Sequence, residues 1–147
     1  MATDKDSKWT LHRRIPSDTA TGSALVHEIM DAMTKRNWSP QDLFRVQLAY
    51  EEAIVNAIRH GNRHDCKKTV EVKMSCDDER VEIQITDQGC GFDPDSIPDP
   101  RSEELLEVPG GRGVLLMSEI MSEISYNKAG NQITMIKHKE NSESQDE

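Results

Sequence analysis

The chain has 147 residues and a formal net charge of −9, and its 35% hydrophobic and 31% charged residues fit a globular domain better than a disordered chain. This length is enough for one domain with a sizeable core. The acidic balance, without a basic patch or tail, argues against direct binding to nucleic acid or to an anionic membrane. No apolar run approaches the roughly 20 residues that span a bilayer. The three cysteines show no CxxC spacing, so we expect a cytoplasmic protein without a disulfide framework or zinc site.

Both ends of the chain are charged and polar. The segment ENSESQDE, residues 140–147, carries four acids and no base, and we expect it to be a disordered tail. The segment MATDKDSK, residues 1–8, has a similar composition and is also predicted to be disordered. The folded domain should therefore occupy residues 9–139.

A strand and a helix are predicted first. The stretch KWTLHRRIP alternates weakly between polar and apolar residues and ends at Pro16, which favours a strand. From Thr19 to Arg36, apolar residues recur at helical spacing, and Asp18 or Ser17 can serve as the N-cap. We expect a single helix over this range.

The second predicted helix runs from about Pro40 to His60. Ser39 is a good N-cap, proline suits the first helical position, and Gly61 is a plausible residue to follow the last turn. At about 100° per residue, the apolar stripe turns away from a polar face made of Glu52, Asn56 and Arg59. That face is either an ordinary solvated surface or a surface turned towards a ligand.

Glu52 and Asn56 offer specific chemistry to a ligand. An amide oxygen is a hard ligand that suits Mg²⁺. A carboxylate one helical turn away can accept a proton from a water or a hydroxyl. Glu51 points about 100° away from Glu52 and is the weaker candidate for that role.

Strict alternation predicts two β-hairpins. The stretches TVEVKMSC and RVEIQITD, residues 69–76 and 80–87, flank a DDE turn, and their apolar residues share one face. The stretch EISYNKAGNQITMIKHK, residues 123–139, forms the second hairpin and turns at KAGN. The stretch VLLMSEIMSE, residues 114–123, has helical spacing. This order of elements favours an α+β two-layer sandwich, with a mixed, mostly antiparallel sheet covered on one face by three helices.

Two glycine-rich segments lie in the long connection between the hairpins. In DQGCGFD, Asp87 ends a strand, and Gly89 and Gly91 follow it. These glycines either form a tight turn or let the backbone approach a flat ligand, with the carboxylate accepting a hydrogen bond from an exocyclic amine. In PGGRGVLLM, three glycines and an arginine lead into a helix. They either form a flexible linker or present backbone N–H groups to phosphates.

Taken in order, ExxxN on a helix, DxGxG after a hairpin and GGxG before a later helix are more specific than any one motif. The chain resembles the Bergerat-fold ATP-binding domain over nearly its whole length, from about Trp9 to Lys137. Within that fold, EEAIVNAIRHG, DQGCGFD and GGRGVLLM are most similar to the small stand-alone anti-sigma factor serine-protein kinases. The resemblance implies ATP and Mg²⁺ as cofactors.

The resemblance also implies a role for each motif residue. Asn56 would ligate the Mg²⁺ that bridges the phosphates. Glu52 would be the general base that activates a serine hydroxyl of a protein substrate. Asp87 would bind the adenine amino group, in a pocket shaped by Gly89 and Gly91.

The phosphates would be held at the last motif. By the same resemblance, Gly111 and Gly113 would contact them, together with a helix starting near Val114. Arg112 either neutralises phosphate charge or is a solvated residue of the lid. The mobile lid itself is expected at residues 94–109.

The implied activity is that of an anti-sigma factor kinase. Such a protein phosphorylates a STAS-domain anti-anti-sigma antagonist, sequesters a sigma factor while that antagonist is phosphorylated, and often forms a homodimer. The alternative is a nucleotide-gated binding module of the same fold without kinase activity. A third possibility is an α+β domain whose glycine loops are only structural.

Overall fold

The computed structural model describes residues 8–63, 65, 67–89 and 111–139, with side chains for all of these except residues 111–115. Apart from Lys8, the predicted disordered ends lie outside these ranges. The elements in chain order are β1 (Trp9–Pro16), α2 (Thr19–Ala24), α3 (Val26–Lys35), α4 (Pro40–Asn56), the π-helix η1 (Ala57–Gly61), β2 (Thr69–Cys76), β3 (Arg80–Thr86), α5 (Gly111–Ile120), β4 (Glu123–Tyr126) and β5 (Gln132–His138).

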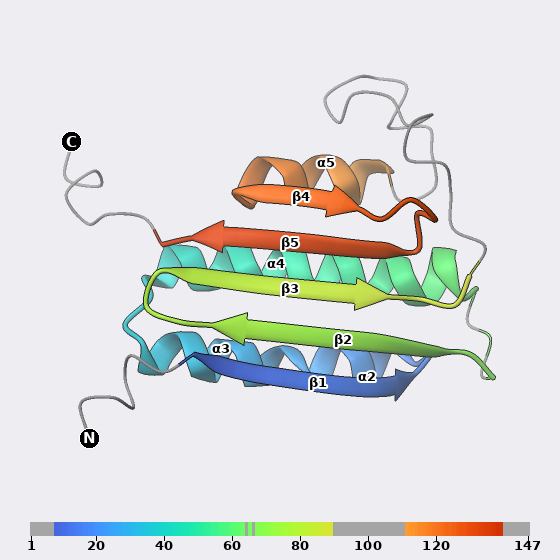
Figure 1. The fold of residues 1–147 in the computed structure, drawn as a ribbon, viewed down its shortest axis with the longest axis horizontal. Helices are drawn as coiled ribbons and strands as arrows, with labels where there is room; N and C mark the ends of the chain where they lie inside the picture. The colour runs from blue at the N-terminus through green and yellow to red at the C-terminus, as the bar shows by residue number, and fades with distance from the viewer. Residues whose placement is uncertain (1–7, 64, 66, 90–110, 140–147) are drawn as a thin grey trace.

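The described residues form one sheet in the order β1-β2-β3-β5-β4, with the helices on one face (Figure 1). This confirms the predicted two-layer α+β sandwich. The sheet was expected to be mixed, but every described pairing is antiparallel. Each neighbouring pair runs antiparallel because hairpins or longer connections return the chain along the sheet in the opposite direction.

Alternation in the strands places their apolar residues between the sheet and the helices. Val72 pairs with Ile85 and Met74 pairs with Ile83, and all four are buried, as predicted for this hairpin. The second predicted hairpin is confirmed as β4 and β5, with a turn at Gly130, whose φ of 75° favours glycine. The buried faces of α3 and α4 supply the other half of the core.

The prediction of a single first helix is wrong, because the chain forms two helices, α2 and α3, on either side of Leu25. At the break, the Leu25 N–H bonds to the Gly22 carbonyl, three residues earlier, at 3.3 Å. That spacing is tighter than the α-helical ladder. The same carbonyl accepts a hydrogen bond from the buried Tyr50 hydroxyl of α4. The break therefore coincides with a contact to another helix, which local periodicity does not report.

Helices α2 and α4 each begin with a side-chain cap. Asp18 caps α2, and the Ser39 hydroxyl of α4 accepts a hydrogen bond from the Asp42 N–H at 3.1 Å. The predicted second helix is confirmed, although its last turn is the π-helix η1. Gly61 was expected to follow the last turn as a C-terminal cap, but it lies within η1, and the left-handed residue is Arg63, with φ of 53°.

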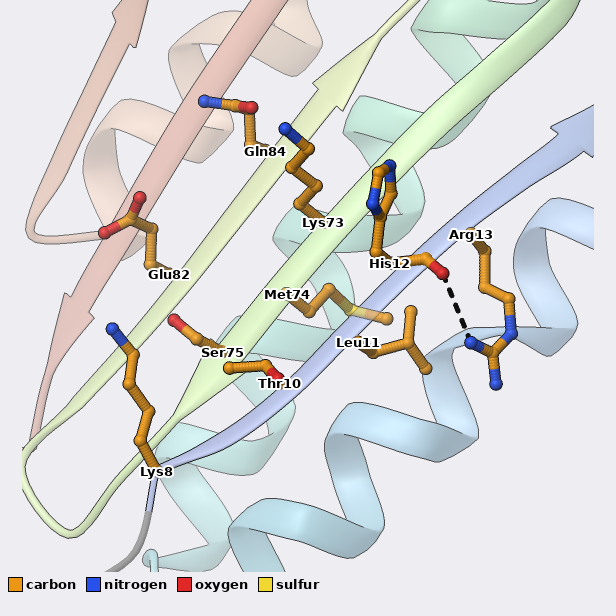
Figure 2. A pocket seen from close by; sticks show the side chains of 10 residues that line it. All are labelled: Lys8, Thr10, Leu11, His12, Arg13, Lys73, Met74, Ser75, Glu82 and Gln84. Carbon is orange, nitrogen blue, oxygen red and sulfur yellow. Dashed lines mark hydrogen bonds between the residues drawn. The ribbon is translucent and has the colours of Figure 1, made fainter.

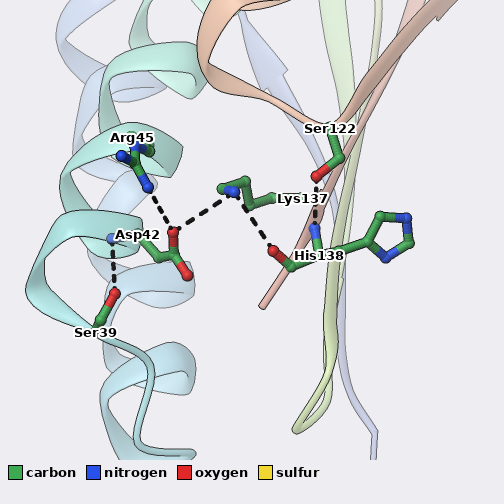
Figure 3. A network of polar contacts seen from close by, with 6 residues as sticks. All are labelled: Ser39, Asp42, Arg45, Ser122, Lys137 and His138. Carbon is green, nitrogen blue, oxygen red and sulfur yellow. Dashed lines mark hydrogen bonds and ion pairs between the residues drawn. The ribbon is translucent and has the colours of Figure 1, made fainter. Parts of the chain in front are cut away.

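A buried ion pair fixes the start of α4 against the sheet. Lys137 of β5 places its Nζ 3.6 Å from Oδ1 of Asp42, and the two side chains are only 7% and 1% exposed. Arg45, one turn along α4, lies 3.2 Å from the same oxygen (Figure 3). Because buried charges are costly unless they are paired, this network holds the first turn of α4 on β5.

The opposite face of the sheet carries none of the described helices. A hollow of about 520 Å³ opens there over β1, β2 and β3 (Figure 2). Polar side chains form much of its lining, among them Thr10, His12, Lys73, Ser75, Glu82 and Gln84. This hollow lies on the other side of the sheet from α4, so it is separate from the site predicted around Glu52 and Asn56.

Candidate functional site

Helix α4 presents Glu52 and Asn56 one helical turn apart. Both residues are half-buried, whereas Ala53 and Ile54 between them belong to the core. Among the described residues, neither the Glu52 carboxylate nor the Asn56 amide has a hydrogen-bond or ion-pair partner. Arg59, which was predicted to share this face, is exposed and lies in η1. Glu52 and Asn56 are therefore the candidate pair on this helix for binding a ligand.

The π-helix η1 brings the end of this helix against the loop that follows β3. The Asn62 N–H bonds to the Ala57 carbonyl, five residues earlier, at 2.8 Å. Gly61 then packs on Asp87, so closely that a β-carbon on Gly61 would overlap the Asp87 carboxylate. A β-carbon on Gly89 would likewise overlap the Gly61 carbonyl group. Close contact, rather than backbone conformation, therefore requires glycine at both positions.

Asp87 is held through both its backbone and its side chain. Its N–H donates to the Asn131 carbonyl at 2.9 Å, and Asn131 Nδ2 donates to the Asp87 carbonyl at 3.1 Å. The Gly89 N–H donates to Oδ1 of the carboxylate at 2.8 Å. Burial raises the pKa of the Asp87 carboxyl, while the Gly89 N–H and the Lys68 ammonium act in the opposite direction. Such a fixed, half-buried carboxylate can accept a hydrogen bond from an amine of a ligand.

Two asparagines outside the predicted motifs hold this loop. Asn131 lies in the turn between β4 and β5, and Asn62 directly follows Gly61. Asn62 is fully buried, and its Oδ1 accepts a hydrogen bond from the Gln88 N–H at 2.7 Å. Asparagine is common in turns, so neither position stands out without knowledge of what the side chain contacts.

Helix α5 lies beside α4 in the helical layer (Figure 1). It begins at Gly111, whereas its start was predicted near Val114. Glycine is disfavoured in a helix by only about 1 kcal/mol relative to alanine, so this segment can form the first turn. The backbones of Gly111, Arg112 and Gly113 therefore lie where N–H groups have no partner within the helix. Gly91 and the predicted lid, residues 94–109, lie outside the described residues.

Asn56 is the described candidate for holding Mg²⁺. In the part of the chain that the structure describes, no group of three or more His, Cys, Asp or Glu side chains could hold a metal ion. Mg²⁺ commonly takes only one or two protein oxygens and completes its shell with waters and substrate phosphates. A half-exposed amide oxygen without a described partner fits such a partial set of ligands.

Most of the chain matches a known protein family. The family described as the histidine kinase-like ATPase domain matches residues 15–137. The chain belongs to the histidine kinase-like ATPase domain family. The matched region of this ATPase domain contains all three predicted motifs, from the α4 pair to the start of α5.

Similar proteins of known sequence include several protein kinases. The serine-protein kinase RsbW of Bacillus velezensis is 24% identical to this ATPase domain, covering 87% of this chain and 84% of the relative. RsbW of Bacillus subtilis is 25% identical, covering 91% and 88%. The serine/threonine-protein kinase BtrW of Bordetella bronchiseptica is also 25% identical, covering 88% and 92%. These matches confirm the predicted resemblance.

The fold of this ATPase domain is also found among solved structures. A structure of the RsbU and RsbW domains of a Mycobacterium tuberculosis protein matches with a TM-score of 0.60 and 15% identity. The match covers 89% of this chain and 32% of that protein, and it shows the fold alone. None of the described helices is both long enough and apolar enough to cross a membrane.

Proposed function

We propose that this chain is an ATP-dependent protein serine kinase that acts as an anti-sigma factor. Its substrate is a STAS-domain anti-anti-sigma protein, and it sequesters a sigma factor while that substrate is phosphorylated. The relatives named as serine-protein kinases support the chemistry. The observation that carries the proposal is the placement of Glu52 and Asn56 on a helix whose π-helical end packs against Asp87.

Each residue has a defined part in the proposed reaction. The serine oxygen of the substrate bonds to the γ-phosphorus of ATP, the bond from that phosphorus to the β–γ bridging oxygen breaks, and ADP leaves. Glu52 accepts the hydroxyl proton. Asn56 holds Mg²⁺, which neutralises phosphate charge when it is bound. Asp87 accepts a hydrogen bond from the adenine amine, and the backbone of residues 111–114 contacts the phosphates.

The proposal extends to the organisation of the protein. The catalytic domain spans residues 9–139, with Gly91 in the adenine pocket and a lid at residues 94–109. We place the activity in the cytoplasm, where ATP and sigma factors are found, with a homodimer as the active form. Neither nucleic acid nor a membrane is proposed as a direct partner, because the net charge of −9 disfavours binding to polyanions.

Phosphotransfer from γ-labelled ATP tests the activity. Wild type, Glu52→Gln and Glu51→Gln are incubated separately with Mg²⁺ and each STAS-domain protein of the source organism. Wild type should place acid-stable label on one of these proteins. Glu52→Gln should lower the transfer rate by about 10²–10⁴-fold, the usual contribution of a general base, with ATP affinity nearly unchanged. Glu51→Gln is the matched control, since the neighbouring side chain points elsewhere, and it should retain activity.

Each other outcome has a distinct meaning. Equal loss of transfer in the Glu51 and Glu52 variants would contradict the role of Glu52. ATP binding by wild type without transfer to any STAS-domain protein would favour the nucleotide-gated binding module. Absence of ATP binding in both wild type and Asn56→Ala would leave only a structural role for the glycine loops.

A further inference from the structure

Asn62 joins three segments of the fold at one buried point. Its Nδ2 donates to the Ser17 hydroxyl oxygen at 2.8 Å and to the Thr69 carbonyl at 2.9 Å. Its Oδ1 accepts a hydrogen bond from the Gln88 N–H at 2.7 Å. Ser17 follows β1, Thr69 begins β2, and Gln88 directly follows Asp87. A single amide supplies these two donations and one acceptance, which is what the asparagine side chain offers.

Gln88 is tied to the same junction a second time. Its side-chain Oε1 accepts a hydrogen bond from the Thr69 N–H at 2.7 Å. The residue after Asp87 is therefore held through its backbone by Asn62 and through its side chain by the start of β2. The Asp87 carbonyl and the Gln88 N–H belong to the same planar peptide group, so fixing the Gln88 N–H also fixes the Asp87 carbonyl.

We propose that Asn62 is a positioning residue for recognition of the adenine base through Asp87. The inference rests on the proposed function, because it takes Asp87 to be the acceptor for the adenine amine. The Oδ1 of Asn62 holds the N–H of Gln88, the residue after Asp87. Its Nδ2 is anchored to the residue that follows β1 and to the start of β2. Hydrogen bonds weaken steeply as distance and angle depart from their optimum. Loss of this anchor should therefore misalign Asp87 with the base, while Glu52 and Asn56 stay on α4.

A purely structural role for Asn62 makes a different prediction. Asn62→Ala removes three hydrogen bonds at a fully buried position, so it lowers thermal stability in either case. A structural role changes the affinities for ATP and GTP by the same factor. A positioning role weakens ATP selectively, because adenine carries an exocyclic amine where guanine carries a carbonyl oxygen.

The test compares the Mg²⁺-dependent affinities of the full chain for ATP and GTP, measured by calorimetry below the unfolding temperature of each variant. In Asn62→Ala, the preference for ATP over GTP should fall by about tenfold, the effect of losing one well-aligned hydrogen bond. Ser17→Ala is the matched control. It removes one partner of the Asn62 amide and the bond from Ser17 to the Lys68 carbonyl, at 3.0 Å. It keeps the Thr69 and Gln88 contacts of Asn62, so its nucleotide preference should stay at the wild-type value.

An unchanged preference in Asn62→Ala, or an equal fall in Ser17→Ala, would overturn the proposal. If Asn62→Ala does not fold, Gln88→Ala makes the same test, because this exposed side chain contributes only the tie to Thr69. There the preference should fall by about two- to threefold, and no fall would overturn the proposal. A wild type that binds neither nucleotide, or both equally, would instead refute the base-binding role of Asp87 in the proposed function.

Discussion

Gly61, in the π-helical end of α4, packs directly on the carboxylate of Asp87, and a β-carbon on Gly61 would overlap that carboxylate. The contact joins the helix that carries Glu52 and Asn56 to the loop that follows β3. Two motifs that are far apart in the sequence are thereby brought into contact.

Gly61→Ala should weaken ATP binding by about tenfold or more, because the added carbon displaces Asp87 from its position. Calorimetric titration with ATP and Mg²⁺ measures this. Gly22→Ala is the matched control, since its β-carbon would lie 2.8 Å from Ile54 Cγ1, within the core. That variant should lose about 1–3 kcal/mol of stability from overpacking and keep its ATP affinity. Wild-type affinity in Gly61→Ala would contradict the requirement for this contact.

Asp87→Asn should stabilise the nucleotide-free protein at neutral pH while weakening ATP binding. Burial raises the pKa of the Asp87 carboxyl in the folded state, so the folded state holds its proton more tightly than the unfolded state. Stability therefore falls as pH rises from the unfolded pKa through the folded pKa. Asparagine removes this loss. The stability gap between variant and wild type, measured by urea unfolding, should be largest near neutral pH and shrink towards pH 4 and below. A gap that grows on acidification would contradict this reading of Asp87.

Lys137→Met should lower the unfolding free energy by about 1–3 kcal/mol, because the buried Asp42 carboxylate loses its lysine partner while it keeps Arg45. Urea denaturation measures this cost. Lys35→Met is the control, since the Lys35–Asp31 pair, 3.1 Å apart, is exposed and solvent-screened. It should change stability far less. Similar costs for the two variants would show that burial does not strengthen the Asp42–Lys137 pair.

Native Cys76 should react slowly with alkylating reagents. The thiol is buried at the end of β2, and burial raises its pKa to about 11. Little thiolate, the reactive form, is then present at pH 8. Labelling followed by peptide mass spectrometry, which separates Cys76 from the other two cysteines, should show rapid modification only after denaturation in urea. Rapid native labelling of Cys76 would contradict its burial.

Local patterns in the sequence were sufficient for the strands and for most of the helical layer. Alternation in TVEVKMSC and RVEIQIT predicted which side chains enter the core, because every second residue of a strand faces the same side. Ser39 and Pro40 marked the start of α4, since a cap and a first-turn proline act within one turn. The motifs also predicted the family, through residue types at short spacings. The roles of Glu52, Asn56, Asp87 and the later glycines remain predictions.

Contacts between distant segments decided what the local patterns could not. The break at Leu25 accompanies the hydrogen bond from Tyr50 to Gly22, and the need for glycine at position 61 comes from Asp87. Asn62 resembles any polar residue after a helix until its partners on β1, β2 and the Asp87 loop are known. Periodicity and capping report interactions within a few residues, whereas burial and hydrogen bonding depend on which segments the whole fold brings together. Only the tertiary structure could therefore show that the end of α4 and the Asp87 loop lie in contact.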